Sequence, residues 1–340
     1  MGLNFRGALG ALVAASGLLA ATPSAWAADF VMKVSSPAPL TDVDPLSAWM
    51  RAFEAGVEEA SGGRIDVQLY PSSQLGPIPA TVEGVAMGTI EMTMPAIGFM
   101  VGVDPRFQVL DSDGLFDDEY HALKTLNDPA VRAMLADFGA NAGVEPMMIW
   151  TSGQSVLVTR DPVGAVADLD GKKIRTAGNT PLVIKPLEAM GVAPVAMPLG
   201  DVLPGIQTGQ IDGTTLNLPV AVGFKFADVA KNVTYMPKKF AIIGGIVSRD
   251  FMARIGPDLE GIVREQAIRA NEAFAGKLDS GPQILEGAWG KAGGTLHRFE
   301  GAERDNYLSI ARGEVEKIMA ADAELKAVYD VIMQAAEANR

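Results

Sequence analysis

The sequence contains no cysteine among its 340 residues. Disulfide bonds and thiolate metal sites are therefore excluded, and so is a lipid anchor on an N-terminal cysteine. Histidine is scarce as well, with only His121 and His297, which lie far apart among charged or polar neighbours. We interpret both histidines as surface residues rather than catalytic groups.

Sequence patterns that bring catalytic or phosphate-binding groups together are also missing. The chain has no HExxH, GxSxG, Walker A or GxGxxG pattern, which removes the commonest metal, nucleophile and phosphate-binding devices. Asp117, Asp118 and Glu119 are consecutive, so on a helix they point in different directions. We interpret them as the acidic start of a helix rather than a metal site. We expect no enzymatic activity, no cofactor and no bound metal.

Residues 1–27 have the layout of a cleaved secretory signal peptide. Arg6 is the only charged side chain, an apolar run covers 8–21, and the small-residue triplet Ala25-Trp26-Ala27 follows. The run is shorter than the ~20 residues that a membrane-spanning helix needs, and no later stretch reaches that length without charges. The mature chain, beginning near Ala28, is predicted to be periplasmic, freely diffusing and without direct membrane anchoring.

Positive charge is in short supply. The formal net charge is −13, from 28 Lys and Arg against 41 Asp and Glu. Such an excess repels nucleic acids and anionic membranes, so we expect no nucleic-acid partner. With 48% hydrophobic and 20% charged residues, the composition is that of a globular protein. The length exceeds one typical core, which favours two domains.

Short strand-like segments alternate with helical ones, which indicates an α/β fold. The predicted strands are residues 30–34, 64–70, 90–94, 144–150 and 155–159. The predicted helices are residues 45–61 and 78–87, followed by a mostly helical C-terminal third with helices at 257–291 and 302–338.

Two segments of the sequence resemble each other, Gly88 to Thr93 and Gly209 to Thr214. In each, a glycine ends an amphipathic helix that a Leu-Gly pair introduces, and the chain turns into a strand. The upstream spacings differ, so the likeness indicates either two similar lobes or merely a common helix-to-strand turn. Because no linker separates the halves, two lobes would be joined by more than one crossing, and such crossings form a hinge.

A longer pattern runs from Val158 to Gly213. It contains Pro162, "DLDGKKIR" at 168–175, "GVAPVAMP" at 191–198 and "IQTGQIDG" at 206–213. This block resembles the solute-binding proteins of TRAP transporters of the dicarboxylate-binding (DctP) type, in which a "DLKGxKIR" run precedes a "GAxPxP" strand and an "ALQTGxVDG" turn. Two earlier stretches, "SGGRIDVQLYPSSQLG" at 61–76 and "GLFDDEYHA" at 114–122, are similar to motifs of the same family. The likeness covers nearly the whole mature chain.

This resemblance implies an α/β, two-lobed periplasmic binding protein (class II-like) with hinge segments and long C-terminal helices. We expect residues 28–152 plus about 241–280 to form lobe I, and residues 153–240 plus about 281–340 to form lobe II. The implied function is capture of a small organic acid by lobe closure and its delivery to the small and large membrane subunits of a TRAP transporter. The sequence does not identify the acid.

Arg175 is the first candidate for the ligand site. The resemblance implies that it forms a two-pronged salt bridge with the ligand carboxylate, and a planar guanidinium suits that task better than an ammonium group. Lys172 and Lys173 precede the strand, and we expect them to be solvated. Strand alternation places Lys173 and Arg175 on one face, so alternation alone does not choose between them.

Further candidates come from strand ends and crossing segments. Asn217 lies one position away from the ligand-contacting asparagine of the family, which leaves Thr215 as a competitor. The second arginine that many relatives carry is absent, so either the ligand carries less negative charge than a dicarboxylate, or uncharged donors such as Ser152 and Gln154 replace the arginine. Trp150 could stack on a ligand, but we favour core packing for it, whereas Phe224 fits a place near the ligand and core packing equally. Loop residues after first-lobe strands complete the set, because strand ends face the cleft in such folds: Ser35, Asp44 and Pro95 to Gly98.

Three other functions remain open at this point. A periplasmic binding protein of the ABC type would share the fold and localisation, although the "KIR" to "DG" block and the long C-terminal helices disfavour it. A ligand-sensing protein that docks onto a separate membrane receptor is compatible with the same features. A periplasmic lyase or hydrolase on a similar fold would require turnover of a bound carboxylate.

Overall fold

The computed structural model describes residues 28–278 and 281–340, so the predicted signal peptide lies outside the described residues. The strands are β1 (Phe30–Ser35), β2 (Ile65–Tyr70), β3 (Met92–Thr93), β4 (Val144–Thr159), β5 (Lys173–Thr176), β6 (Ala193–Ala196), β7 (Gly213–Asn217), β8 (Asn232–Ser248) and β9 (Thr295–Arg298). The helices are α1 (Pro45–Ala60), α2 (Ile78–Ala86), α3 (Glu119–Leu126), α4 (Pro129–Leu135), α5 (Pro181–Ala189), α6 (Val202–Gln207), α7 (Leu218–Gly223), α8 (Arg249–Arg269), α9 (Asn271–Ala275), α10 (Gly281–Lys291), α11 (Gly301–Ala321) and α12 (Ala323–Ala338). Two 3₁₀ helices, η1 (Ile97–Phe99) and η2 (Pro105–Asp111), follow β3.

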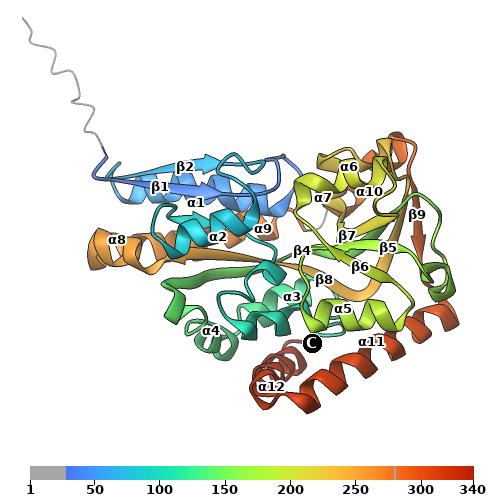
Figure 1. The fold of residues 1–340 in the computed structure, drawn as a ribbon. Helices are drawn as coiled ribbons and strands as arrows, with labels where there is room; N and C mark the ends of the chain where they lie inside the picture. The colour runs from blue at the N-terminus through green and yellow to red at the C-terminus, as the bar shows by residue number, and fades with distance from the viewer. Residues whose placement is uncertain (1–27, 279–280) are drawn as a thin grey trace, which may run out of the picture.

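The strands of the sheet follow the order β2-β1-β3-β8-β4-β7-β5-β6. Counted inward from its two edges, the sheet has two corresponding halves, in which β2, β1 and β3 match β6, β5 and β7. On one side β1 pairs in parallel with β2 and β3, and on the other β5 pairs in parallel with β6 and β7. Helices connect the corresponding strands, α1 and α2 in the first half and α5 and α6 in the second (Figure 1). The antiparallel strands β4 and β8 lie between the halves. The predicted two-lobed α/β fold with long C-terminal helices is confirmed.

The two similar sequence segments occupy corresponding places in this arrangement. Gly88 and Gly209 both follow a helix, α2 and α6, and adopt left-handed backbone with φ of 73° and 75°. In each segment the isoleucine two residues later donates its N–H to a helix glycine carbonyl at 3.2 Å, Ile90 to Gly84 and Ile211 to Gly205. The likeness therefore reflects two similar lobes.

The hydrophobic core is divided into four clusters of buried side chains. In the first lobe, β1, β3, α1, α8 and α9 enclose one cluster, and α2, α3, α4 and η2 enclose another. In the second lobe, two clusters involve α6, α7 and α10 on one side and α5 and α11 on the other. The cluster around α2, α3 and α4 also contains Leu182 of α5 and Val315 and Met319 of α11, so at this place the two lobes pack against each other.

The crossing strands change lobes at a disturbed stretch of their pairing. On β4, residues 144–150 pack in first-lobe clusters and residues 156–158 pack in second-lobe clusters. Between them the register with β8 shifts twice, once from Thr151 to Gln154 and again from Gln154 to Val156, and Gly153 has a φ of 98°. On β8 the facing stretch contains Lys238, with a φ of 50°. Such bulges bend strands locally, and they supply the predicted hinge.

Local sequence explains how α1 is set in place. The Asp44 side chain accepts a hydrogen bond from the Ser47 backbone N–H at 2.8 Å, and Pro45 occupies the first turn, where its missing N–H costs nothing. Trp49, Phe53 and Val57 recur every four residues and are fully buried in the first-lobe core.

Several sequence predictions need correction. The separate strands predicted at 144–150 and 155–159 form the single strand β4, because pairing with β8 continues across the bulges. The strand predicted at 90–94 shortens to β3. The helix predicted at 257–291 is divided among α8, α9 and α10, although the kink at Gly256, with φ 78°, agrees with its predicted start at Pro257. The helix predicted at 302–338 is divided into α11 and α12, and Asp322 caps the start of α12 with two hydrogen bonds of 3.0 Å.

His121 is buried, not on the surface as its charged neighbours suggested. It lies on α3, where its Nδ1 accepts the backbone N–H of Asp117 at 2.9 Å and its Nε2 donates to the carbonyl of Ala336 on α12 at 2.8 Å. His297 is partly buried on β9. The acidic run before His121 starts a helix as predicted, since Asp118 is the N-cap of α3.

The last helix packs against the first lobe. Leu325, Val328 and Ile332 of α12 are buried in the cluster that also holds residues of α3 and α4, and Figure 1 shows α12 beside these helices, whereas α11 runs along α5 of the second lobe. The sequence prediction had grouped all of 281–340 with lobe II. The chain thus returns to the first lobe at its end.

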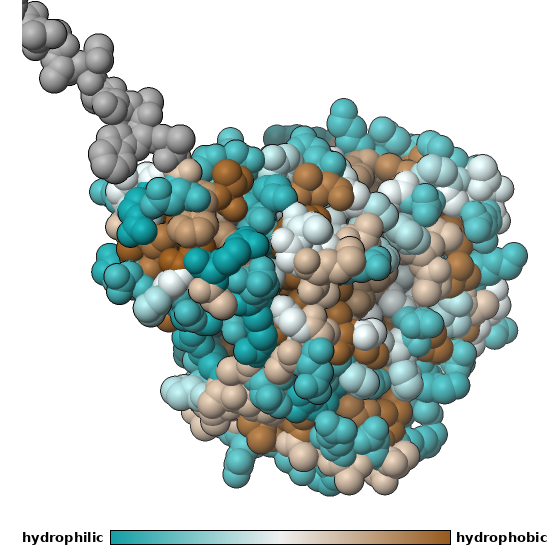
Figure 2. Space-filling model, turned by 60° about the vertical axis from the view of Figure 1, so that its left-hand side comes forward, coloured by the Kyte–Doolittle hydropathy of each residue, from teal (hydrophilic) through white to brown (hydrophobic). Residues whose placement is uncertain are grey.

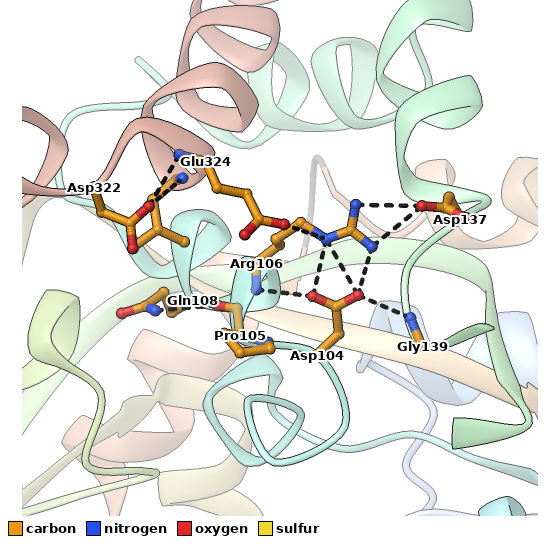
Figure 3. A network of polar contacts seen from close by, with 9 residues as sticks. Asp104, Pro105, Arg106, Gln108, Asp137, Gly139, Asp322 and Glu324 are labelled. Carbon is orange, nitrogen blue, oxygen red and sulfur yellow. Dashed lines mark hydrogen bonds and ion pairs between the residues drawn. The ribbon is translucent and has the colours of Figure 1, made fainter. Parts of the chain in front are cut away.

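An ion-pair network fixes the start of α12 to η2 (Figure 3). Arg106 pairs with Asp104 at 2.6 Å, with Asp137 at 3.3 Å and with Glu324 of α12 at 3.7 Å. Its guanidinium also stacks over the ring of Phe138, 4.3 Å from the ring centre. Burial opposes ionisation of Asp104, but the hydrogen bonds from Arg106 hold the pKa of this carboxyl below its usual value.

Replacing Arg106 by alanine is expected to lower the free energy of unfolding by about 1–3 kcal/mol, because the partly buried Asp104 carboxylate loses its charged partner. Arg254→Ala is the matched control, since Arg254 forms an exposed pair with Asp250 within one helix, and it should cost less than about 0.5 kcal/mol. Urea unfolding measures both. Equal effects of the two substitutions would contradict this account.

The outer surface is mixed in character. On the face shown in Figure 2, hydrophilic residues cover both sides, and a band of paler and brown residues runs down the middle. Large exposed hydrophobic side chains are Val31, Met87, Tyr120, Ile268 and Ile284. Among the described residues, no helix is both long and apolar enough to cross a membrane.

Candidate ligand-binding site

A cavity of about 110 Å³ lies between the lobes. The first lobe contributes the loop after β1, the start of α1 and α2 and the segment after β3, and the second lobe contributes the end of β5, β7 and the start of α7. The crossing strands add Ser152, Ala241 and Ile243. Because both lobes and the hinge strands form its wall, opening of the hinge would expose this cavity.

Arg175 is the positive charge of the cavity wall. The residue is only 2% exposed, its Nε donates to the carbonyl of Met197 at 2.8 Å, and its Nη1 donates to the carbonyl of Thr215 at 3.4 Å. Its Nη2 donates to none of the described residues, and none of their carboxylates pairs with it. Burial lowers the pKa of Arg175 to about 10, so the group stays charged at neutral pH. A buried, unpaired guanidinium requires an anion.

The neighbouring lysines differ from Arg175. Lys173 is exposed at the start of β5, and Lys172 forms an ion pair with Asp161 at 3.5 Å. Both lie outside the cavity wall, whereas Arg175 is part of it. Of these two residues of β5, only Arg175 therefore reaches the interior of the fold.

Asn217, Ser152 and Thr215 all line the cavity. The Asn217 side chain caps α7 by accepting the N–H of Val220 at 3.1 Å, and its amide donates to the Ser152 carbonyl at 2.9 Å and to the Ser152 hydroxyl. The Thr215 hydroxyl donates to the Arg175 carbonyl at 3.2 Å. These residues hold the strands around Arg175 together, and each also presents a surface to the cavity.

Asp44 faces the same cavity from the first lobe. Burial raises the pKa of this carboxyl, while hydrogen bonds from the hydroxyl and backbone N–H of Ser47, at 2.7 and 2.8 Å, act in the opposite direction. The carboxylate that caps α1 is therefore also a polar group of the cavity wall.

The remaining candidates lie outside the cavity wall. Trp150 is fully buried in the first-lobe core, where it packs against Trp49 and donates to Asn271 at 3.0 Å. The Gln154 side chain donates to the carbonyl of Met236 at 2.8 Å. Phe224 packs against a second-lobe cluster. Ser35 lies at the buried end of β1. Pro95 lies just after β3, and its carbonyl accepts the backbone N–H of Gly244 in β8.

The position of Ser35 is informative, because it corresponds to that of Arg175. Ser35 pairs with Thr93 between β1 and β3, and Arg175 pairs with Thr214 between β5 and β7. The first lobe thus carries a small hydroxyl where the second lobe carries the cation. Among the described residues that line this cavity, the one cation is Arg175 of the second lobe.

Sequence reasoning missed the contact that brings the lobes together. A Cβ on Gly98, in η1, would lie 2.9 Å from the carbonyl oxygen of Ala177, and one on Gly178 would lie 2.8 Å from the carbonyl oxygen of Gly98. These backbones touch directly across the lobes, immediately after the Arg175 strand. The sequence signal for this contact is limited to the two glycines, Gly98 and Gly178. No local pattern connects residues that lie 80 positions apart.

Substituting Gly98 by alanine is expected to weaken ligand binding by about tenfold or more, or ~1.4 kcal/mol, because the added methyl group meets backbone atoms that cannot rotate away and keeps the lobes apart. Gly102→Ala is the control, since a Cβ there meets nothing within 4 Å. Isothermal titration of both variants with a ligand of the parent protein measures the effect. Equal affinities for the two would contradict a role of this contact in closure.

Within residues 28–278 and 281–340, no group of three or more acidic or histidine side chains is placed to hold a metal ion. The fold and the site together define a class: two α/β lobes on crossing strands, closing on a cavity with one buried unpaired cation, make a solute-binding protein. Residues 40–322 match the family described as bacterial extracellular solute-binding protein, family 7 (DctP), and the chain belongs to this family. The resemblance to the DctP type is confirmed, and with it the expectation of a binding protein rather than an enzyme.

The chain is similar to curated and solved members of this group. It is 29% identical over 221 residues to the 2,3-diketo-L-gulonate-binding periplasmic protein YiaO of Escherichia coli, covering 65% of this chain and 66% of that protein. It is 29% identical to the C4-dicarboxylate-binding periplasmic protein DctP of Rhodobacter capsulatus, covering 75% and 76%. A TRAP periplasmic solute-binding protein from Desulfovibrio salexigens with bound orotic acid has the same fold, with a TM-score of 0.84 at 20% identity, covering 91% and 99%.

Proposed function

We propose that this chain is the periplasmic component of a TRAP-type transporter, and that it captures a small organic acid whose carboxylate binds Arg175. The observation that carries this proposal is the buried guanidinium with an unused Nη2 at the wall of an interlobe cavity. The names of relatives support the ligand class, because a diketo-gulonate, dicarboxylates and orotic acid all carry a carboxylate.

The absence of a second arginine favours a ligand with one carboxylate at this end of the cavity. The segment that would carry it, residues 150–154, presents Ser152 to the cavity and no cation. Asn217 holds Ser152 by its amide, so the hydroxyl is fixed in place for a neutral contact. A single ion pair with several hydrogen bonds and an apolar wall suffices for micromolar affinity, which requires about 8 kcal/mol.

Binding proceeds by closure without chemical conversion. In the open form the ligand carboxylate meets Arg175 on the second lobe, and bending at the β4 and β8 bulges brings the first lobe over it. Removal of water then strengthens the charge-assisted hydrogen bonds. The closed form is the one that the small and large membrane subunits receive.

We also propose lobe boundaries at residues 152/153 and 240/241. Lobe I comprises 28–152 and about 241–280, and lobe II comprises 153–240 and the region from about 281 onward. The packing of α12 against α3 and α4 supports adding residues 323–338 to lobe I.

Thermal unfolding against a panel of organic acids tests the function. An acid that binds the folded state raises the melting temperature, and the corresponding neutral carboxamide should leave it unchanged because it offers Arg175 no charge. Ligand carried through purification is removed by unfolding and refolding, and mass spectrometry of the released molecules should identify an acid. Equal stabilisation by an acid and its carboxamide would refute the proposal. So would the absence of stabilisation by any acid, if mass spectrometry also finds no released acid.

A further inference from the structure

A second cavity adjoins the main one. It has a volume of about 80 Å³ and shares the wall residues Ala96, Ala177, Thr215, Leu216 and Ala241 with the cavity that contains Arg175. Its other walls come from both lobes, from the crossing strands and from α11, and they include Asp111, Lys239 and Tyr307. The second cavity is therefore the immediate neighbour of the space next to Arg175.

Asp111 is the one carboxylate of this second cavity that lacks a partner among the described residues. The other charged and hydroxyl groups that line this cavity are paired: the Lys239 ammonium donates to the Asp113 carboxylate at 3.0 Å and to the backbone carbonyl of Asp111, and the Tyr307 hydroxyl donates to Asp113 at 3.1 Å. The Asp111 side chain takes part in none of these bonds. Its Oδ2 lies beside Gly98, 3.1 Å from where a Cβ on that glycine would stand.

The environment of Asp111 is unfavourable for a free charge. Burial raises the pKa of this carboxyl to about 6, Asp113 adds to the rise, and Lys239 counteracts part of it. A carboxyl whose pKa is higher in the folded than in the unfolded state stabilises the fold at acidic pH and loses that contribution as the pH rises through about 6. At neutral pH the ligand-free protein thus holds an ionised group that the fold does not pair.

We propose that Asp111 is a second recognition point of the ligand site and accepts a hydrogen bond from a donor group, a hydroxyl or an ammonium, at the end of the ligand away from its carboxylate. This inference rests on the proposed function, in which Arg175 holds the carboxylate. Adjoining cavities then present one unpaired cation and one unpaired anion, so the complementary ligand is an organic acid with a hydrogen-bond-donating tail. A plain alkyl acid would cover the half-buried Asp111 carboxylate without offering it a partner, which is costly.

The test uses straight-chain carboxylates of four to six carbons that end in methyl, hydroxyl or ammonium, titrated calorimetrically against the parent protein, Asp111→Asn and Asp258→Asn. Asp258 is an exposed carboxylate and serves as the control for loss of one charge. In the parent protein and the control, at least one donor-ended acid should bind about tenfold or more tighter than its methyl-ended counterpart. Asp111→Asn should remove this difference and change the affinity for methyl-ended acids less than twofold. If Asp111→Asn removes the preference for ammonium-ended acids alone, the ligand is a zwitterion. If it removes the preference for hydroxyl-ended acids, the ligand is a hydroxy acid.

A stability measurement separates this role from a structural one. Asp111→Asn should raise the melting temperature of the ligand-free protein at neutral pH and leave it unchanged near pH 4, where the carboxyl is protonated. A lower melting temperature at neutral pH, or no discrimination between methyl-ended and donor-ended acids, would overturn the role of Asp111 alone. Failure of every acid to bind the parent protein would instead overturn the proposed function on which this inference rests.

Discussion

Replacing Arg175 by alanine should weaken carboxylate binding by about 2–5 kcal/mol, which is roughly 30-fold to several-thousand-fold in Kd. The guanidinium is buried at the cavity wall, and none of the described carboxylates pairs with it. Isothermal titration with an acid found by the thermal panel measures the loss.

The variant should remain folded, because removing a buried charge without an ionic partner does not cost stability. In the absence of ligand its melting temperature should equal or exceed that of the parent protein. Lys173→Ala is the matched control, since Lys173 precedes Arg175 by two residues on the same strand but is exposed. Arg175→Lys should recover only part of the affinity, because an ammonium group cannot make paired contacts. An unchanged Kd for Arg175→Ala would disprove the anchor.

Replacing Trp150 by alanine should lower the free energy of unfolding by about 3–5 kcal/mol. The side chain is fully buried, lies 4.7 Å from the ring of Trp49 and 6.5 Å from that of Phe274, and donates to Asn271. Its removal leaves a large void in the first-lobe core and an unpaired amide oxygen. Urea unfolding, followed by titration under conditions where the variant is folded, separates stability from binding.

Binding by folded Trp150→Ala should be unaltered, because the indole lies outside the cavity wall. Phe224→Ala is a useful comparison. Because Phe224 is only partly buried against its cluster, its replacement should lower the free energy of unfolding by less than that of Trp150. If Trp150→Ala lost affinity while keeping its unfolding free energy, the residue would have to be reassigned from the core to the ligand.

The parts of the site that could be predicted are those that follow from local rules. Arg175 came from a motif and from the chemistry of carboxylate recognition, and Asp44 from the rule that loops after strands face the cleft. The role of an aromatic residue such as Trp150 or Phe224 does not follow from its local sequence, because the pattern is the same whether the ring faces a core or a ligand. Trp150 lies within β4, and its surroundings are made by α1 and α9, which are distant in the sequence.

The parts that were missed depend on contacts between distant segments. Gly98 meets Ala177 across the two lobes, and the Asp111 side chain lacks a partner because the Lys239 ammonium pairs with Asp113. His121 was misplaced for the same reason, since its neighbours in sequence are charged but α12 covers it. The fold itself was more accessible, because alternating strand and helix patterns and the repeated Gly-x-Ile turn are local signals.

The return of the chain end to the first lobe has a consequence for the order of folding. The Trp49 indole donates to the carbonyl of Ala267, and His121 donates to that of Ala336. The first-lobe helices α1 and α3 therefore bond to residues that lie more than 200 positions later in the sequence. Contacts of such long sequence separation form slowly. The core of the first lobe is therefore expected to be completed only when α12 has docked, which places this step late in folding.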